Sequence, residues 1–142
     1  MKTNVDLHQL VECVGDAIIV ADAKERIILW NPAATRIFGY SEQEALGQTL
    51  DLIVPERQRQ KHNEGYSHSM ETGTTRYGTS LLKVPAKHQN GTTLSIAFTV
   101  GMLFDDSGKA NGVVAIIRDE TARFAEERAL KKRISDLENP QI

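Results

Sequence analysis

The sequence predicts an α+β domain in which two short strands come first, helices follow, and three antiparallel strands complete the fold. Apolar residues alternate with small and polar ones over 93–104, which is the period of a strand in a sheet with one buried face. The segments 89–91 and 105–108, on either side of this stretch, are hairpin-turn signals. The 142 residues are enough for about one domain with its own core.

The first elements are a helix and two strands. In the segment 5–14, apolar residues recur at the spacing of one helical face, which predicts a short amphipathic helix. The apolar runs 17–21 and 27–30 are separated by a polar turn and predict two paired strands.

Three helices should follow these strands. Asn31-Pro32 is an N-cap followed by proline at the first helical position, which predicts a helix through about residue 38. Ser41 and Glu44 have the spacing of a capping box and predict a helix of about one and a half turns. A longer helix is predicted over 56–72, after a proline.

The last part of the chain predicts three strands, over 77–87, 92–104 and 113–118. The run 113–117 is apolar on both faces, so we expect another element to cover its outer side.

The final segment, 121–138, predicts a polar helix in which Glu127 can pair with Lys131 one turn later. A thin apolar stripe at coiled-coil spacing consists of Leu130, Ile134 and Leu137. We expect this helix to cover the outer face of the sheet together with the N-terminal helix.

The composition excludes several classes of protein. The 17 Lys and Arg against 19 Asp and Glu leave a formal charge of −2, without the basic excess that binding to phosphate backbones requires. The single cysteine, Cys13, forms no disulfide within the chain and no cysteine cluster for a metal. Acidic residues interrupt the N-terminal apolar run, so we expect a cytoplasmic protein without direct nucleic-acid or membrane binding.

Several motifs together resemble those of PAS domains, over about residues 8–121 of the chain. These motifs are Asp16-Ala17-Ile18-Ile19-Val20-Ala21-Asp22, Ile28-Leu29-Trp30-Asn31-Pro32-Ala33-Ala34, Phe38-Gly39-Tyr40, Ala45-Leu46-Gly47, Asn90-Gly91-Thr92 and Asp119-Glu120-Thr121. The resemblance implies the PAS fold, a five-stranded antiparallel sheet with helices on one face around a pocket, and a role in sensing or dimerisation. We therefore divide the chain into an N-terminal helix (1–15), a PAS sensor domain (16–121) and a C-terminal signalling helix (122–142).

The resemblance also points to a cofactor. Flavin- and cinnamoyl-binding photosensors of this family need a pocket cysteine, which is missing here. His62 lies in a stretch similar to that of haem-binding PAS domains in oxygen- and carbon-monoxide-sensing proteins, where a histidine on the long helix is the proximal ligand of the haem iron. We expect haem b, bound through His62.

Other residues are expected to line the haem pocket. Gly65 and Tyr66 lie on the helical face of His62, and glycine there, although it costs ~1 kcal/mol relative to alanine, would let a flat macrocycle approach the backbone. The strands should contribute Leu82, Leu94, Ile96, Phe98 and Ile116.

Leu82 occupies the position where oxygen-sensing relatives place a distal arginine. Because leucine donates no hydrogen bond, the distal side is expected to be apolar or to use Met102 or Met70 as a ligand. Carbon monoxide, nitric oxide or redox state is then favoured over oxygen as the signal.

An alternative function stays open, namely a haem-free PAS module for dimerisation or protein interaction, or a binder of another small ligand. With either function, we expect the chain to form a homodimer through its N- and C-terminal helices and to act on an output domain or partner protein. The sequence has no phosphate-binding loop, dinucleotide fingerprint or nucleophile elbow, so we expect no enzymatic activity.

Overall fold

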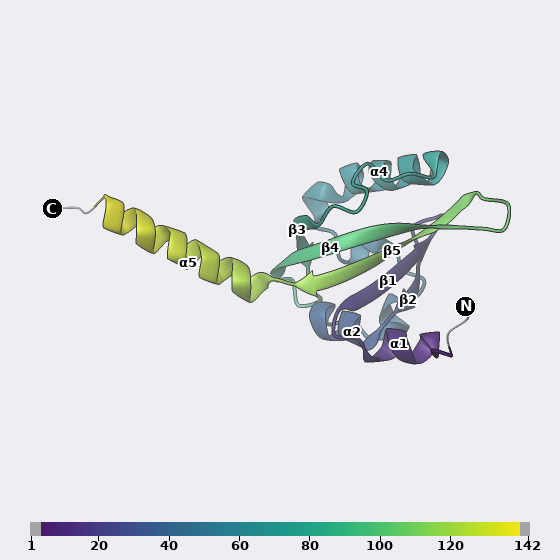
Figure 1. The fold of residues 1–142 in the computed structure, drawn as a ribbon, viewed down its shortest axis with the longest axis horizontal. Helices are drawn as coiled ribbons and strands as arrows, with labels where there is room; N and C mark the ends of the chain where they lie inside the picture. Colours follow the sequence, from purple (N-terminus) through teal and green to yellow (C-terminus); the bar gives the residue numbers. More distant parts are fainter. Residues whose placement is uncertain (1–3, 140–142) are drawn as a thin grey trace.

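A computed structural model describes residues 4–139 as one α+β body from which a long helix projects (Figure 1). The helices are α1 (Leu7–Cys13), α2 (Pro32–Phe38), α3 (Glu42–Ala45), α4 (Arg59–Thr72) and α5 (Thr121–Glu138), with 3-10 turns η1 (Leu50–Leu52) and η2 (Glu56–Gln58). The strands are β1 (Ala17–Asp22), β2 (Ile27–Trp30), β3 (Leu82–Lys87), β4 (Thr93–Phe104) and β5 (Ala110–Asp119).

The five strands form one antiparallel sheet in the order β2-β1-β5-β4-β3. The first and last strands of the chain, β1 and β5, therefore pair with each other at the centre of the sheet. The predicted α+β class and the five-stranded antiparallel sheet are confirmed.

One face of the sheet, called the inner face here, packs against α2, α3 and the segment after α3. Trp30, Phe38, Ile19 and Ile27 are the largest fully buried side chains of this core. The opposite, outer face carries the alternate residues of each strand, because side chains in a strand alternate between faces. Which face a residue occupies therefore decides whether it can reach α4.

Asn31 joins three elements at the base of the domain. Its side-chain oxygen accepts hydrogen bonds from Ile18 N (2.9 Å) and Ala34 N (3.1 Å), which fixes β1 and caps α2. Its amide nitrogen donates to Val11 O (2.9 Å) and Asp16 O (3.1 Å), which holds the end of α1 in place. The predicted N-cap is thus also the connection between α1 and the sheet.

Two predicted boundaries differ from the structure. The strand predicted over 77–87 begins at Leu82, because Gly78 has a positive φ of 57° and Ser80 N bonds to Tyr77 O in a turn. The helix predicted over 56–72 starts with the 3-10 turn η2 and becomes α-helical at Arg59.

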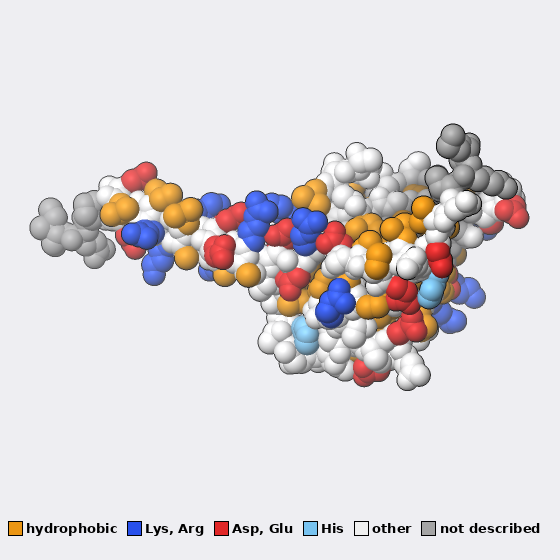
Figure 2. All heavy atoms as spheres, turned by 60° about the horizontal axis from the view of Figure 1, so that its bottom comes forward, with side chains coloured by type: hydrophobic (Ala, Val, Ile, Leu, Met, Phe, Trp, Pro, Cys, Tyr) orange, Lys and Arg blue, Asp and Glu red, His pale blue; other side chains and the backbone are white. Residues whose placement is uncertain are grey.

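The prediction that α5 covers the outer face of the sheet is wrong. This helix extends away from the body (Figure 1), its first turn touches β4, and none of its residues is buried. Glu127 pairs with Arg123 at 3.5 Å rather than with Lys131. Charges of both signs and apolar side chains alternate along the helix (Figure 2).

No helix within residues 4–139 is long and apolar enough to cross a membrane.

We predict that Asn31→Ala destabilises the domain by about 3 kcal/mol, because it removes a helix cap and leaves buried backbone groups without partners. Chemical denaturation measures the change. The control Asn90→Ala removes an amide from an exposed turn, where Asn90 Oδ1 accepts from Thr92 N, and should cost about 1 kcal/mol or less. Equal losses in the two variants would contradict the role given to Asn31.

Candidate functional site

The long helix α4 is attached to the sheet at the turn between β1 and β2. Its main sheet contact is with β5, and its buried residue Tyr66 donates a hydrogen bond of 2.6 Å from its hydroxyl to Asp22 O. Burial raises the pKa of the Tyr66 hydroxyl, so Tyr66 stays protonated as the donor. The helix ends at Gly73, which has a positive φ of 73°.

The turn that holds α4 has a specific conformation. Asp22 Oδ1 accepts hydrogen bonds from Lys24 N and Arg26 N, both at 2.9 Å. Within the turn, Glu25 has a φ of 66°, which is uncommon for a residue other than glycine. This conformation directs the Glu25 carboxylate toward α4.

The carboxylate of Glu25 meets the ring of His62. Glu25 Oε1 lies 2.8 Å from His62 Nδ1, as an ion-pair contact rather than an aligned hydrogen bond. The contact engages Nδ1 and leaves Nε2 as the ring nitrogen that faces away from Glu25. A carboxylate at one ring nitrogen is the usual arrangement of a histidine that binds a metal through the other.

The surroundings of His62 favour its protonated form when no metal is bound. Burial is the largest influence on the pKa of His62 and lowers it, but Glu25, Asn63 and the charge of Asp51 together outweigh burial and raise the pKa above its ordinary value of 6.5. The resulting stabilisation of the fold is therefore present below about pH 6.5 and is lost as the pH rises through the raised pKa.

Polar atoms without aligned hydrogen bonds gather around this contact. Among the described residues, the buried ones are Glu25 Oε1, Asp51 Oδ1, His62 Nδ1 and Asn63 Oδ1. Each such atom costs about 1–3 kcal/mol when it lacks a partner. These buried polar atoms therefore mark the start of α4 as a candidate functional site.

Opposite α4, an apolar strip of the inner face is only half-buried. It consists of Leu82, Phe98, Val100 and Met102, and we call it the inner strip. Leu82 pairs with Phe98 across the β3–β4 ladder, so both side chains point to the same face, and Phe98 packs on the core. Because α4 packs mainly on β5, the inner strip keeps part of its apolar surface available to a ligand.

The other strand residues predicted for the site lie elsewhere. Leu94 packs on the core and Ile96 is part of it, so both support the sheet rather than line an open space. Ile116 is on the outer face, 38% exposed and paired with Thr99 and Ile18; Ile117 is the buried, inward-facing neighbour. The prediction for Ile116 is wrong because the run is apolar on both faces and gives no period.

Two residues predicted for the site, Gly65 and Met70, lie on α4. A Cβ at Gly65 would meet no atom within 4 Å and the residue is exposed, so no protein group requires glycine there. Met70 lies two turns beyond His62 on the same helix. It therefore cannot face His62 from the opposite side of a planar ligand, which leaves Met102 of the inner strip as the methionine on the opposite wall.

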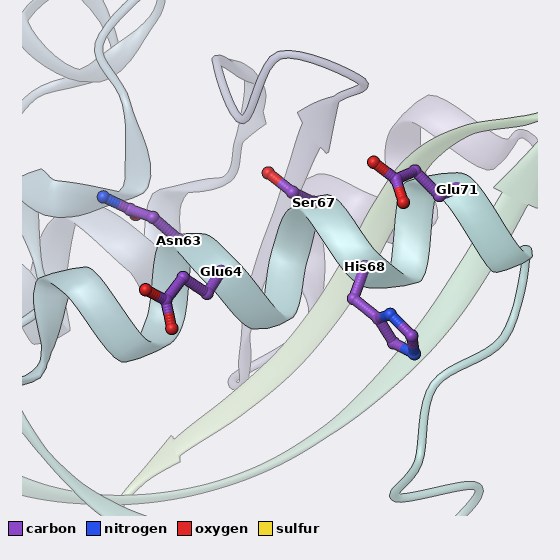
Figure 3. Close-up of a pocket in the computed structure, with 5 residues that line it drawn as sticks. All are labelled: Asn63, Glu64, Ser67, His68 and Glu71. Carbon is purple, nitrogen blue, oxygen red and sulfur yellow. The ribbon is translucent and has the colours of Figure 1, made fainter.

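Two surface hollows of the described residues include neither His62 nor any residue of the inner strip. One, of about 380 Å³, is lined by Asn63, Glu64, Ser67, His68 and Glu71. All five residues come from α4 and their side chains point to different sides of the helix (Figure 3), which does not make an enclosed site. The other lies between α1, β2 and α3.

The residues present fit a haem group. His62 has a carboxylate at Nδ1 and directs Nε2 away from it, the backbone beside Gly65 is unobstructed, and the inner strip is apolar. These are the features that a planar, largely apolar ligand with a central iron requires. Glu25 and Val100 were not predicted from the sequence; the alternation of β4 indicates Val100, whereas only the fold brings Glu25 to His62.

A five-stranded antiparallel sheet in the order β2-β1-β5-β4-β3, with helices packed on its inner face, defines a sensory domain of the PAS class. The family described as "PAS fold" matches this chain over residues 6–119, and the chain belongs to this family.

Two curated relatives are sensors. The chain is 30% identical over 131 residues to Sensor protein FixL of Bradyrhizobium diazoefficiens, with 92% of this chain and 26% of FixL covered. It is 24% identical over 127 residues to Oxygen sensor protein DosP of Escherichia coli, with 87% of this chain and 16% of DosP covered. The chain thus spans about a quarter of FixL and about a sixth of DosP.

Solved structures agree on the fold. The PAS domain of a protein from Colwellia psychrerythraea superposes with a TM-score of 0.71 at 22% identity, covering 82% of this chain and 95% of that chain. The PAS domain of BvgS from Bordetella pertussis superposes with a TM-score of 0.64 at 18% identity, covering 95% and 96%.

We predict that Glu25→Gln lowers the pKa of His62, because burial then acts against a weaker opposing charge. An NMR titration of the His62 ring, in protein without added haem, measures the shift. Glu12→Gln is the matched control, since Glu12 lies on α1, 3.5 Å from another histidine, His8, and its substitution should leave the His62 titration unchanged. An unchanged His62 titration in Glu25→Gln would contradict the role of Glu25.

Proposed function

We propose that this chain is a sensory domain that binds haem b through His62 and responds to a diatomic gas or to a change of redox state. The observation that carries the proposal is the placement of His62, with Nδ1 against the Glu25 carboxylate and the apolar inner strip across from α4. The relation to Oxygen sensor protein DosP supports it. When bound, the haem iron supplies the position where a gas binds or an electron is exchanged.

The residues around the iron have separate tasks. His62 would hold the iron through Nε2, and Glu25 at Nδ1 would orient the ring and increase its basicity. The inner strip supplies an apolar wall that excludes water from the other side. Gly65 leaves the backbone of α4 free for close approach.

The strand that carries most of the inner strip also holds the start of α5. Ser95 N donates to Thr121 Oγ1 at 3.0 Å, and Glu120 N donates to Ser95 O at 2.8 Å. Thr121 N in turn donates to Asp119 Oδ1 at 2.9 Å. A displacement of β4 therefore reaches α5 through hydrogen bonds, and α5 passes it to an output domain or partner protein.

A second function, that of a haem-free module for dimerisation, is supported by exposed apolar residues on the two terminal helices. Leu7 and Leu10 of α1 are exposed, as are Leu130, Ile134 and Leu137 of α5. A homodimer that pairs these helices would bury them, with or without haem.

The first function predicts a Soret band when the purified protein is mixed with haem, and loss of that band in His62→Ala, because the iron loses its ligand. His68→Ala is the matched control, since His68 lies on the same helix, is exposed, and should keep the band. Circular dichroism confirms that both variants fold. A wild-type protein without a Soret band, or a His62→Ala variant with a normal one, would exclude haem binding through His62 and favour the haem-free module.

We also predict that Leu130→Glu with Ile134→Glu shifts the protein from dimer to monomer, because two charges replace the apolar stripe of α5. Multi-angle light scattering over a concentration series measures the mass. Ser135→Glu is the control, since it adds a charge to α5 outside the stripe and should leave the dimer intact. A monomeric wild-type protein, or equal behaviour of both variants, would contradict pairing through α5.

A further inference from the structure

We propose that the groove between α1, β2 and α3 binds an extended, positively charged segment of a partner protein, which pairs with the free edge of β2. We call this hollow of about 330 Å³ the β2 groove. Its lining comes from α1, from β2 and its end at Asn31, and from α3 with the residue that follows it. It is a second site of the chain, and its function does not depend on haem.

The strand β2 lies at the edge of the sheet and is only partly covered. The segment after α3 pairs with its start, where Ile27 N donates to Gln48 O at 2.8 Å and Gly47 N donates to Ile27 O at 2.9 Å. In the part of the chain that the structure describes, no strand pairs with this edge beyond Ile27. An unpaired edge is where another chain can add a strand.

The backbone of Trp30 faces the free edge. Asn31 N donates to Ile18 O on β1 at 3.3 Å. Because successive residues of a strand direct their backbone groups to opposite sides, the N–H and C=O of Trp30 point away from β1. Trp30 lines the β2 groove, and within residues 4–139 no backbone group from outside the sheet bonds to it. An extended peptide offers the donor and the acceptor that these two groups lack.

The lining of the β2 groove combines apolar surface with negative charge. Ile28 and Leu46 are 57% and 41% exposed. Glu12 and Glu42 add two carboxylates, and the lining has no Lys or Arg. The nearest titratable neighbour of Glu12 is His8, at 3.5 Å. A segment with apolar and basic side chains complements this lining.

A second copy of the chain is a poorer occupant than a basic segment. The helix α1 carries no Lys or Arg, so two copies that met at this groove would bring Glu12 and Glu42 of one chain close to the same carboxylates of the other. Like charges oppose such a symmetric contact. The charge of the lining therefore assigns the β2 groove to a different protein.

The test titrates isotope-labelled protein with the peptide Lys-Val-Ile-Val-Lys and follows the amide signals by NMR. The Trp30 amide signal should shift, and its hydrogen exchange should slow, because the peptide supplies its partner. A peptide with glutamate in place of both lysines should bind roughly tenfold more weakly or worse. A peptide methylated at two successive backbone nitrogens, one of which must face β2, should bind roughly fivefold to tenfold more weakly.

Two pairs of variants test the lining of the groove. Glu42→Lys should weaken binding of the lysine peptide roughly tenfold and strengthen binding of the glutamate peptide, whereas Glu71→Lys, the same change on exposed α4, should alter neither. Ile28→Ser should weaken binding roughly tenfold, and Leu81→Ser, at a 59% exposed leucine outside the groove, should leave it unchanged. Circular dichroism checks that all four variants fold.

Several results would overturn the inference. They are a Trp30 amide that does not respond to the lysine peptide, equal binding of the methylated and unmethylated peptides, and equal effects of Glu42→Lys and Glu71→Lys. A change of oligomeric mass in Ile28→Ser or Glu42→Lys, measured by light scattering, would show that a second copy occupies the groove and would also overturn it. A protein that takes up no haem would overturn the proposed function and leave this inference standing.

Discussion

The position of α4, and with it the whole site, depends on the hydrogen bonds of Asp22 in the β1–β2 turn. The Asp22 carboxylate holds the backbone of the turn, and its carbonyl oxygen accepts from both Glu25 N and the Tyr66 hydroxyl. The turn conformation places the Glu25 side chain against His62. Asp22 therefore fixes the turn, anchors α4 through Tyr66 and places Glu25 beside His62, the candidate iron ligand.

The strand β4 connects this site to the rest of the molecule. Its inner residues form most of the inner strip, its long ladder with β5 reaches the centre of the sheet, and Ser95 binds the first turn of α5. A shift of β4 between two positions would thus change both the wall that faces a ligand and the hydrogen bonds at the start of α5. A ligand shifts such an equilibrium only as far as its affinities for the two positions differ.

Much of this arrangement could be predicted from local sequence. The alternation along β4, the N-cap Asn31 and the capping box of Ser41 and Glu44 depend on neighbouring residues, and the structure has all three. Ile116 was assigned to the wrong face because a run that is apolar on both sides has no period. The contact between Glu25 and His62 joins residues far apart in the chain, so no local pattern contains it.

The site also has two electrostatically different walls, and their difference follows from secondary structure. The helical wall carries Glu25, Asp51, His62 and Asn63 because α4 and two turns converge there, and turns are where polar residues are tolerated. The sheet wall is apolar because every second residue of its strands belongs to the inner face, which also carries the core. A ligand between these walls meets charge on one side only. His62 and the Glu25 carboxylate are thus on the other side from the apolar strip of the sheet, so the two sides can be altered independently by substitution.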